Sequence, residues 1–263
     1  PNGVCWTKDG FLIVVEHNRV LNFPAAEFFY EGPDVAVIEV VPQGQLVPVE
    51  EESFNHGART CRVSDDGRLH ITLGQPFNVP PREKIETYER LGIGGMVSMN
   101  PFDGSKRMVL ARGVRNSVGF DWNPVTKELY FTDNGRDWLS EDLPNDELNR
   151  VTKQGQHFGF PYCHQGNFTD REMGWGRTCD EFEKPVALLG PHAGVLGMRF
   201  YTGKMFPAEY RNGIFIARHG SWNKSKKIGG DVVFVTLNKD GSVKSFTPFL
   251  TGFLQNNAYV GRP

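Results

Sequence analysis

Four segments of this 263-residue chain share one pattern, in which an Asp-Gly-like turn leads into a short alternating strand that ends in polar residues. They are DGFLIVVEHN from Asp9, DGRLHITLGQPFN from Asp66, KELYFTDNGRD from Lys127 and NGIFIARHGSWN from Asn212. A turn followed by alternation is typical of hairpin strands. Its return at intervals of about 60 to 85 residues predicts blades separated by long insertions. Weaker copies in NPFDGSKRMVLARG and NKDGSVKSFTPFLTG are interpreted as outer strands of the same blades.

This repetition favours an all-β fold, a six-bladed β-propeller forming a single domain over residues 1–263. The 30 glycines and 17 prolines agree with a fold rich in turns. A blade takes about 40 to 50 residues, so the chain holds about five, and we expect a propeller that is incomplete at both ends. A β-sandwich is the structural alternative. The one amphipathic segment, PREKIETYERLG, is predicted to be a loop with a helical turn.

Charge and hydropathy exclude two classes of partner. The formal net charge is −2 and the 29 basic residues are scattered, so the chain lacks the basic patch that nucleic acid requires. No apolar run reaches the roughly 18 residues that a membrane-spanning helix needs. We therefore expect neither a nucleic-acid partner nor a membrane span.

The four cysteines bear on the compartment. Cys163 and Cys179 lie 16 residues apart in a glycine-rich loop with almost no apolar periodicity. A disulfide there would remove loop-closure entropy worth about 3 kcal/mol, and two free thiols are the alternative. The spacings CHQ and TCD are not those of zinc sites. Cys5 and Cys61 each fall in a predicted strand, and the sequence leaves their pairing open. We favour an oxidising compartment, periplasmic or extracellular.

Residues 113–166 hold the densest group of candidate functional side chains. Arg115 and Asn116 offer a planar donor fork and an amide, and residues 133–137 offer the carboxylates and turn carbonyls that hard cations prefer. We interpret the combination as a site for an anionic ligand and a cation. Polar residues also flank the other repeated strands, with His56 before the second strand and the others after the second and the fourth. In a propeller they would converge on one mouth of the channel, although each could be a simple turn residue. They are His56, Gln75, Asn78, His219, Trp222, Asn223 and Lys224.

Several of these segments match a known family. They are GVRNSVGF, ELYFTDNGRDW, DELNR, HFGFPYC, LGMRFYTG, ARHGSWNKS and the terminal GRP. From about His56 to Pro263 the chain resembles the soluble quinoprotein sugar dehydrogenases, in particular the L-sorbosone dehydrogenase-like branch. The resemblance implies a six-bladed propeller that binds pyrroloquinoline quinone (PQQ) and calcium at the channel mouth. It also implies oxidation of the C1 hydroxyl of an aldose or a related sugar, with electrons passing to an external acceptor.

Carried over by residue, the resemblance makes His56 the general base. A structural histidine is the alternative at this position. Gln75 stands where the family has an aspartate that supports the base, and an amide would not raise the basicity of the imidazole as a carboxylate does. Gln75 and Asn78 are expected beside the cofactor.

Four further residues are assigned to the cofactor by the same resemblance. Arg115 and Asn116 match the family's Arg-Asn pair beside the quinone, where a guanidinium would stabilise the negative charge left by hydride transfer. Lys224 and Arg262 match basic residues that bind the cofactor's carboxylates. For Lys224 a solvated loop lysine is the alternative, because SKK follows at once.

The metal ligands follow in the same way. Gly135 and Arg136 align with the family's Gly-Pro dipeptide, whose backbone carbonyls hold the catalytic calcium. Asp146 and Glu147 match an acidic pair that binds a second, structural calcium, with a capped turn as the alternative. The family's phenolic ligand of that second site is replaced here by Phe158.

The function expected from the sequence is therefore a PQQ-dependent sugar dehydrogenase. Two other hypotheses remain: a calcium-dependent propeller hydrolase of the lactonase type, and a non-catalytic propeller that binds a partner. The concentration of Arg115, Lys224 and Arg262 favours a polyanionic cofactor over a hydrolase, which needs several carboxylates on one ion.

Overall fold

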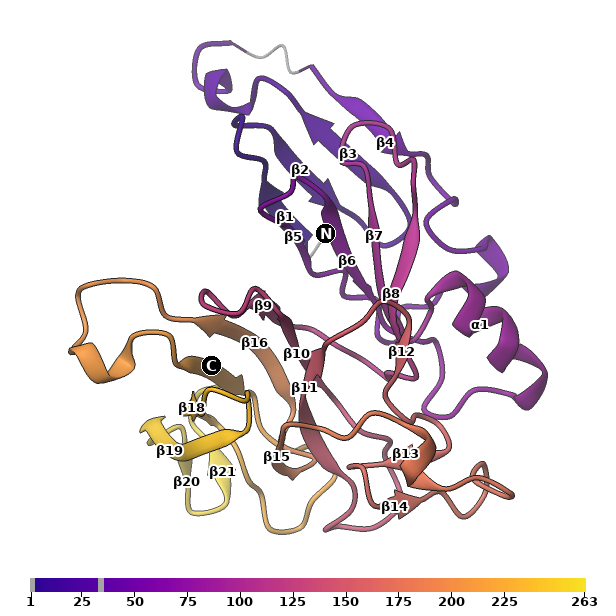
Figure 1. Cartoon of the computed structure of the whole chain (residues 1–263), viewed down its shortest axis with the longest axis vertical. Coiled ribbons are helices and arrows are strands. Elements are labelled where there is room, and N and C mark those ends of the chain that lie inside the picture. The colour runs from indigo at the N-terminus through magenta and orange to yellow at the C-terminus, as the bar shows by residue number, and fades with distance from the viewer. Residues whose placement is uncertain (1–2, 33–35) are drawn as a thin grey trace. The chain divides into compact units, whose positions relative to one another are not determined.

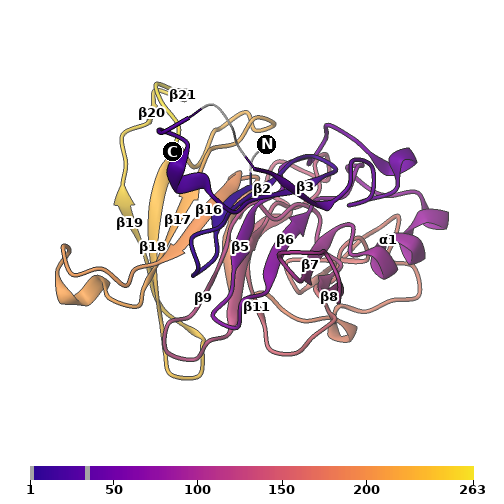
Figure 2. The ribbon, with the colours of Figure 1, turned by 90° about the horizontal axis from the view of Figure 1, so that it is seen from above.

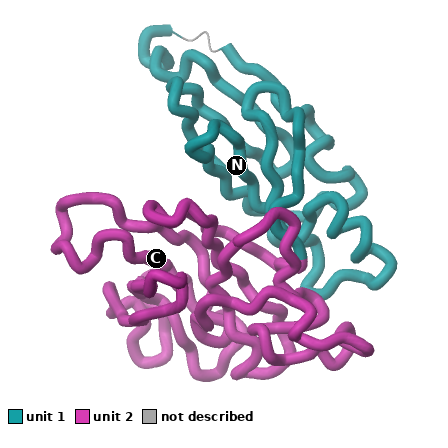
Figure 3. Tube along the Cα trace, viewed as in Figure 1, with its two compact units in different colours: residues 1–112 teal, residues 113–263 magenta. Residues whose placement is uncertain are grey.

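The computed structural model describes residues 3–32 and 36–263. The chain divides into two compact units, unit 1 (Pro1–Arg112) and unit 2 (Gly113–Pro263), coloured separately in Figure 3. Each unit is built around two antiparallel sheets (Figure 1), and the described residues contain one α-helix. The prediction of an all-β chain is confirmed. That the whole chain forms one propeller domain stays a prediction.

Unit 1 contains two sheets of consecutive antiparallel strands. The first has the order β1-β2-β3-β4, with β1 Gly3–Trp6, β2 Leu12–Val15, β3 Val20–Phe23 and β4 Ile38–Val41. The second sheet has its unit 1 strands in the order β8-β7-β6-β5, with β5 Cys61–Val63, β6 Leu69–Leu73, β7 Gly95–Met99 and β8 Met108–Arg112. Gly10 and Gly67 precede β2 and β6 with φ values of 86° and 82°, a left-handed conformation that glycine adopts without strain. The turns predicted from the Asp-Gly pairs are therefore present.

The two sheets of unit 1 pack around one apolar core. Ile13 and Val15 of β2, and Leu69 and Ile71 of β6, are all fully buried in it. Their alternation along each strand follows from the two-residue period of side chains in a sheet. Cys5 and Cys61 form a disulfide that joins β1 to β5, which answers the question that the sequence left open.

The amphipathic segment of unit 1 is more helical than predicted. A 3₁₀ turn at Arg82–Lys84 leads into helix α1, Ile85–Leu91, where the sequence predicted only a loop with a helical turn. Ile85 and Tyr88, three residues apart on one face, are buried. Gly92 ends the helix at φ 77°, and its N–H bonds the carbonyl of Tyr88. Burial of this face stabilises a helix too short to persist by itself.

Unit 2 contains two four-stranded sheets. The first has the order β15-β11-β10-β9, with β9 Phe120–Trp122, β10 Leu129–Asp133, β11 Asn145–Val151 and β15 Ala187–Pro191. The second has the order β16-β17-β18-β19, with β16 Val195–Phe200, β17 Ile214–Arg218, β18 Asp231–Leu237 and β19 Val243–Leu250, the last four being side by side in Figure 2. The prediction that NKDGSVKSFTPFLTG is an outer strand is confirmed by β19.

The sheets of unit 2 also share an apolar core. Tyr130, Leu148 and Leu189 of the first sheet lie in one buried cluster with Ile214 and Val233 of the second. Short elements complete the unit. They are β12 Gln156–His157, β13 Cys163–His164, β14 Phe168–Thr169, β20 Leu254–Gln255, β21 Ala258–Tyr259 and 3₁₀ helices at Cys179–Glu181 and Ala208–Tyr210, to which unit 1 adds Ala26–Phe28 and Val49–Glu51.

The glycine-rich loop after β12 is closed by a disulfide between Cys163 and Cys179, which confirms that prediction. Gly159 in this loop has φ 104°, and an added Cβ would lie 2.8 Å from the carbonyl oxygen of Cys163, so only glycine fits there. The loop is therefore a covalently closed structure, although it contains little regular secondary structure.

The sheets have the form expected of propeller blades. Within each unit, neighbouring strands pair antiparallel, and they are consecutive in the chain except where β15 follows β11 in its sheet, which is close to the meander that radial repetition uses. The count of six blades stays a prediction.

Candidate cofactor and metal site

Asp133, the last residue of β10, holds the Arg-Asn pair in place. Its buried carboxylate accepts hydrogen bonds from the backbone N–H of Arg115, at 3.1 and 3.2 Å, and from that of Asn116, at 2.8 Å. Two segments that lie 18 residues apart in sequence are thereby joined at the end of the strand. The structure thus brings together the Arg-Asn pair and the start of the acidic loop, as the sequence predicted.

The guanidinium of Arg115 lies over the same loop. Its Nη2 is 2.7 Å from a carboxylate oxygen of Asp137, and its Nη1 donates to the carbonyl of Asn134 at 3.4 Å. Arg115 is only 4% exposed, and burial lowers its pKa while the neighbouring Asp137 opposes that shift. An anionic ligand that reaches this guanidinium can replace the Asp137 carboxylate as its ion-pair partner.

Lys224 is the second buried cation of unit 2. Its ammonium lies 3.0 Å from a carboxylate oxygen of Asp142 and also donates to the carbonyl of Glu141. The lysine is 7% exposed, whereas the side chain of Asp142 is 89% exposed. The interpretation of Lys224 as a solvated loop lysine is therefore wrong, because its side chain is buried and paired with the loop after β10.

Asn116 and Asn223 supply polar atoms to the same region. The amide of Asn223 donates to Asp137 at 3.1 Å. The Oδ1 atoms of Asn116 and Asn223 are both buried, and among the described residues neither accepts a hydrogen bond. A buried acceptor without a donor is costly, so these atoms are suited to a ligand.

Arg262 lies at the far end of unit 2 and contacts the segment that carries Lys224. Its Nη1 donates to the carbonyls of His219 and Gly220 at 3.3 and 3.2 Å, and its guanidinium lies 4.0 Å from the centre of the Tyr259 ring. These partners belong to the HGSWN segment, which directly precedes Lys224 in the chain.

The predicted calcium ligands Gly135 and Arg136 follow directly after β10. The N–H of Gly135 donates to Asp146 at 3.0 Å, and the second oxygen of Asp146 accepts from Gly194 at 2.7 Å. No hydrogen bond within residues 3–32 and 36–263 reaches the carbonyl oxygens of Gly135 and Arg136. Backbone oxygens that are not used internally are the ligands that calcium prefers.

Asp146 and Glu147 do not face the same way, because adjacent residues of β11 point to opposite sides of the sheet. Asp146 binds the loops at Gly135 and Gly194, as described above. Glu147 lies opposite Asp133 in the strand register and accepts hydrogen bonds from Asn149 at 2.9 Å and Gln165 at 2.7 Å. Across the described residues no group of three or more His, Cys, Asp and Glu is arranged to hold a metal ion. A second calcium at this pair stays a prediction.

Burial makes these carboxyl groups weak acids. It raises the pKa of Asp133 to about 7, of Asp146 to about 6 and of Glu147 to about 8, and the facing charge of Asp133 adds to the shift of Glu147. Backbone N–H donors counteract the shifts at all three positions only in part. A proton or a cation near Asp133 and Glu147 would relieve their mutual repulsion.

His56, Gln75 and Asn78 belong to unit 1. The Nδ1 of His56 lies 2.7 Å from the backbone carbonyl of Gln75, while the side-chain amide of Gln75 donates to the carbonyl of Phe77. A carbonyl can only accept, so this bond places the proton of neutral His56 on Nδ1 and makes Nε2 the basic nitrogen. The hydrogen bond that orients His56 is therefore made by the backbone carbonyl of Gln75 and not by the side chain at position 75. Convergence of these residues with those of unit 2 stays a prediction.

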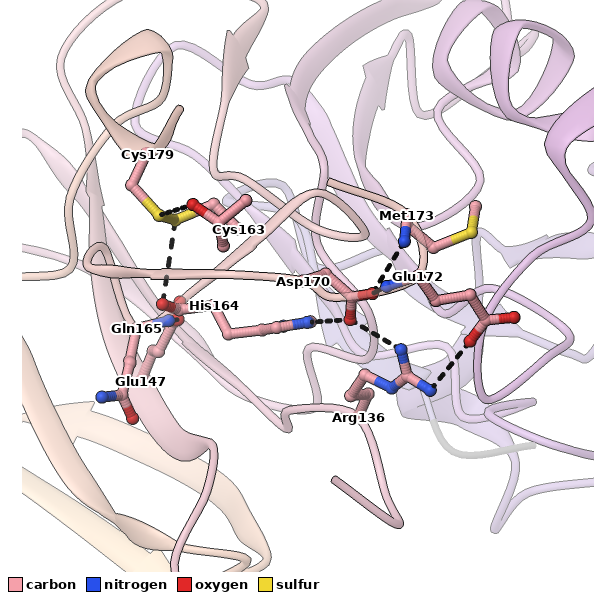
Figure 4. Close-up of polar contacts among 10 residues, drawn as sticks. Arg136, Glu147, Cys163, His164, Gln165, Asp170, Glu172, Met173 and Cys179 are labelled. Carbon is pink, nitrogen blue, oxygen red and sulfur yellow. Dashed lines mark hydrogen bonds and ion pairs between the residues drawn. A yellow bond between two sulfur atoms is a disulfide. The ribbon is translucent and has the colours of Figure 1, made fainter. Parts of the chain in front are cut away.

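Two residues that the sequence reasoning missed lie beside Arg136 (Figure 4). The carboxylate of Asp170 is 2.6 Å from Nη1 of Arg136 and 2.7 Å from Nε2 of His164. Burial by itself would raise the pKa of Asp170, but the hydrogen bonds from His164, Met173 and Arg136 hold it well below the usual range. A histidine and an aspartate six residues apart inside a disulfide loop were a weak signal for this cluster.

The family is decided by comparison of the sequence with known proteins. The profile of the family described as Glucose / Sorbosone dehydrogenase matches residues 43–223. The chain belongs to this family. The resemblance to sugar dehydrogenases seen in the sequence is confirmed, and the matched range includes His56, Arg115 and the loop after β10.

Relatives of this glucose/sorbosone dehydrogenase family member are known from distant organisms. An uncharacterized protein of Borreliella burgdorferi is 36% identical over 226 residues, which cover 83% of this chain and 56% of that protein. The aldose sugar dehydrogenase YliI of Escherichia coli is 27% identical over 199 residues, 71% of this chain and 49% of YliI. The chain thus spans about half the length of these curated relatives.

Solved structures share the fold of this family member. A calcium structure of the carbohydrate-active enzyme family AA12 from Trichoderma reesei gives a TM-score of 0.76 at 21% identity, covering 95% of this chain and 68% of that one. The PQQ domain of pyranose dehydrogenase from Coprinopsis cinerea gives 0.70 at 17% identity, covering 94% and 66%. At these identities the likeness establishes the fold alone. Within the described part of this chain, no helix is long and apolar enough to cross a lipid bilayer.

Proposed function

We propose that this member of the glucose/sorbosone dehydrogenase family is a PQQ- and calcium-dependent oxidoreductase that oxidises an aldose or related sugar and passes the electrons to an external acceptor. The observation that carries the proposal is the bonding of Asp133 to the backbone of both Arg115 and Asn116. It holds the residue whose buried guanidinium contacts Asn134 and Asp137, on either side of the Gly135–Arg136 dipeptide. A cationic group and uncommitted backbone oxygens then lie at one strand end, which suits an anionic cofactor and a hard cation.

The residues of unit 2 fit the cofactor that the family implies. PQQ carries three carboxylates, and Arg115, Lys224 and Arg262 offer cationic groups for them. The buried Oδ1 atoms of Asn116 and Asn223 need a partner that the described residues do not supply. The carbonyl oxygens of Gly135 and Arg136 would hold calcium. When bound, PQQ supplies an electron-accepting quinone and calcium a Lewis acid.

The chain's own groups would perform the remaining tasks. Nε2 of His56 would accept the proton of the sugar hydroxyl, because Nδ1 is committed to the Gln75 carbonyl. The Arg115 guanidinium would stabilise negative charge that develops on the cofactor, and its burial strengthens that interaction by excluding water. Gln75 and Asn78 would lie beside the cofactor, and Asp146 and Glu147 remain candidates for a second calcium.

The disulfides support a proposal for the compartment. Both Cys5–Cys61 and Cys163–Cys179 are formed, and such bonds persist in oxidising environments. We propose a periplasmic or extracellular location for this sugar dehydrogenase.

The test is reconstitution of the purified chain with PQQ and calcium, followed by dye reduction with a panel of aldoses. We expect PQQ binding and sugar-dependent reduction, and we expect His56→Ala to lower kcat by about 10² to 10⁴-fold while the Kd for PQQ is unchanged. Hydrolysis of lactones without PQQ would favour the hydrolase instead. Absence of both PQQ binding and dye reduction would refute the proposal.

A further inference from the structure

Asp170 is a fully buried carboxylate with four donors, and no role proposed so far uses it. Its side chain is 0% exposed. One oxygen accepts from His164 Nε2 at 2.7 Å and from Arg136 Nη1 at 2.6 Å (Figure 4). The other accepts from the backbone N–H of Glu172 and of Met173, both at 2.8 Å. A buried charge with every lone pair engaged is fixed in one orientation.

The loop that carries Asp170 is itself rigidly held. The disulfide Cys163–Cys179 closes it, and the backbone of Asp170 donates to the carbonyl of Tyr162 at 2.8 Å. His164, the partner of Asp170, has a side chain only 3% exposed. Asp170 is therefore a fixed point to which another segment can be attached.

The side chain of Arg136 is held by its ion pair with Asp170. The arginine side chain is 11% exposed, and its Nε is buried without a partner among the described residues. Its second carboxylate contact, Glu172, is longer at 3.4 Å and belongs to a side chain that is 69% exposed. A surface pair of that kind contributes little, so Asp170 supplies most of the restraint on Arg136.

The peptide between Gly135 and Arg136 is thus held from both sides. On one side Asp146 accepts the N–H of Gly135 at 3.0 Å, and on the other the Arg136 side chain is bound to Asp170. The two carbonyl oxygens of this dipeptide are the uncommitted ones described above. Arginine does not restrict φ at position 136, as the proline ring of the family's Gly-Pro dipeptide would. The direction of these oxygens therefore depends on the ion pair that anchors the Arg136 side chain.

We infer that Asp170 is a positioning residue, which orients the Gly135 and Arg136 carbonyls for a calcium ion through its ion pair with Arg136. This inference rests on the proposed function, because it concerns the calcium assigned there to the same carbonyls. Asp170 itself does not touch the metal. Partners that orient metal ligands typically contribute 10 to 100-fold to metal affinity.

The test is calcium titration of the full chain by isothermal calorimetry, with wild type, Asp170→Asn and Glu172→Gln compared. We expect Asp170→Asn to raise the Kd for calcium by about 10 to 100-fold, and Glu172→Gln, which neutralises the exposed carboxylate, to leave it within about twofold. Asp170→Glu should recover part of the affinity. If Asp170→Asn does not fold, Arg136→Met removes the same ion pair from the other side and should weaken calcium equally.

Two results would overturn the inference, and they differ. If wild type binds calcium and both Asp170→Asn and Arg136→Met bind it with unchanged Kd, Asp170 has no positioning role, while the proposed function stands. If wild type binds no calcium, the calcium assignment at Gly135 and Arg136 fails, and the inference fails with it. Thermal unfolding of each variant, measured in parallel without calcium, separates loss of stability from loss of affinity.

Discussion

Removing the Cys163–Cys179 disulfide should destabilise unit 2 by a predictable amount. The bond closes a loop over a sequence separation of 16 residues. The chain-entropy relation for a cross-link then gives about 3 kcal/mol at 25 °C, since the reduced chain gains that freedom on unfolding. The comparison variant removes Cys5–Cys61, which spans 56 residues in unit 1. The same relation gives about 4 kcal/mol there.

The assay is urea unfolding of the double serine variants, followed by tryptophan fluorescence. Four of the five tryptophans lie in unit 2, so the signal reports mainly on that unit, and Trp175 lies inside the disulfide loop itself. We expect Cys163→Ser with Cys179→Ser to lower the midpoint of this transition. The Cys5→Ser and Cys61→Ser variant should move it less, because its cross-link belongs to unit 1.

A loss below about 1 kcal/mol in the unit 2 variant would refute this reasoning. It would mean that the reduced loop stays compact in the unfolded ensemble, or that noncovalent contacts such as the pair of His164 with Asp170 replace the bond. An increase in the slope of free energy against urea would identify a change in the denatured state and distinguish it from a loss of native contacts.

Three further predictions concern separate parts of unit 2. The pKa values of Asp133 and Glu147 are raised to about 7 and about 8, so the folded state keeps protons that the unfolded state releases. Without divalent cations, the stability of the fold should therefore decrease as the pH rises from about 4 to 8. Thermal unfolding across that pH range should show a smaller loss of stability for Asp133→Asn than for wild type. An equal loss in both would contradict the raised pKa assigned to Asp133. Asp142→Asn should lower the Kd for PQQ about two- to fivefold in a fluorescence titration, because an exposed carboxylate would no longer compete for Lys224. A higher or unchanged Kd would contradict this competition. Gly119→Ala should cost about 1–3 kcal/mol in thermal unfolding, since its Cβ would lie 2.3 Å from a carbonyl oxygen, and an unchanged melting temperature would contradict that packing.

The sequence by itself determined the features that depend on neighbouring residues. Turns at Gly10 and Gly67 precede strands as predicted, because a glycine with positive φ and an alternating apolar run are both local properties. The Cys163–Cys179 bond was predictable for a similar reason, since 16 residues of unpatterned loop leave few other ways to hold it. The family was evident from contiguous motifs between residues 113 and 166.

Only the tertiary structure decided which distant groups meet. Helix α1 forms because Ile85 and Tyr88 are buried, which its weak local pattern did not indicate. The pairing of Lys224 with Asp142 joins residues 82 apart, and that of Arg136 with Asp170 joins residues 34 apart. Such contacts depend on how sheets and loops pack. The energy of a buried charge depends on the oppositely charged partner that lies next to it in the folded protein, and not on its neighbours in the sequence.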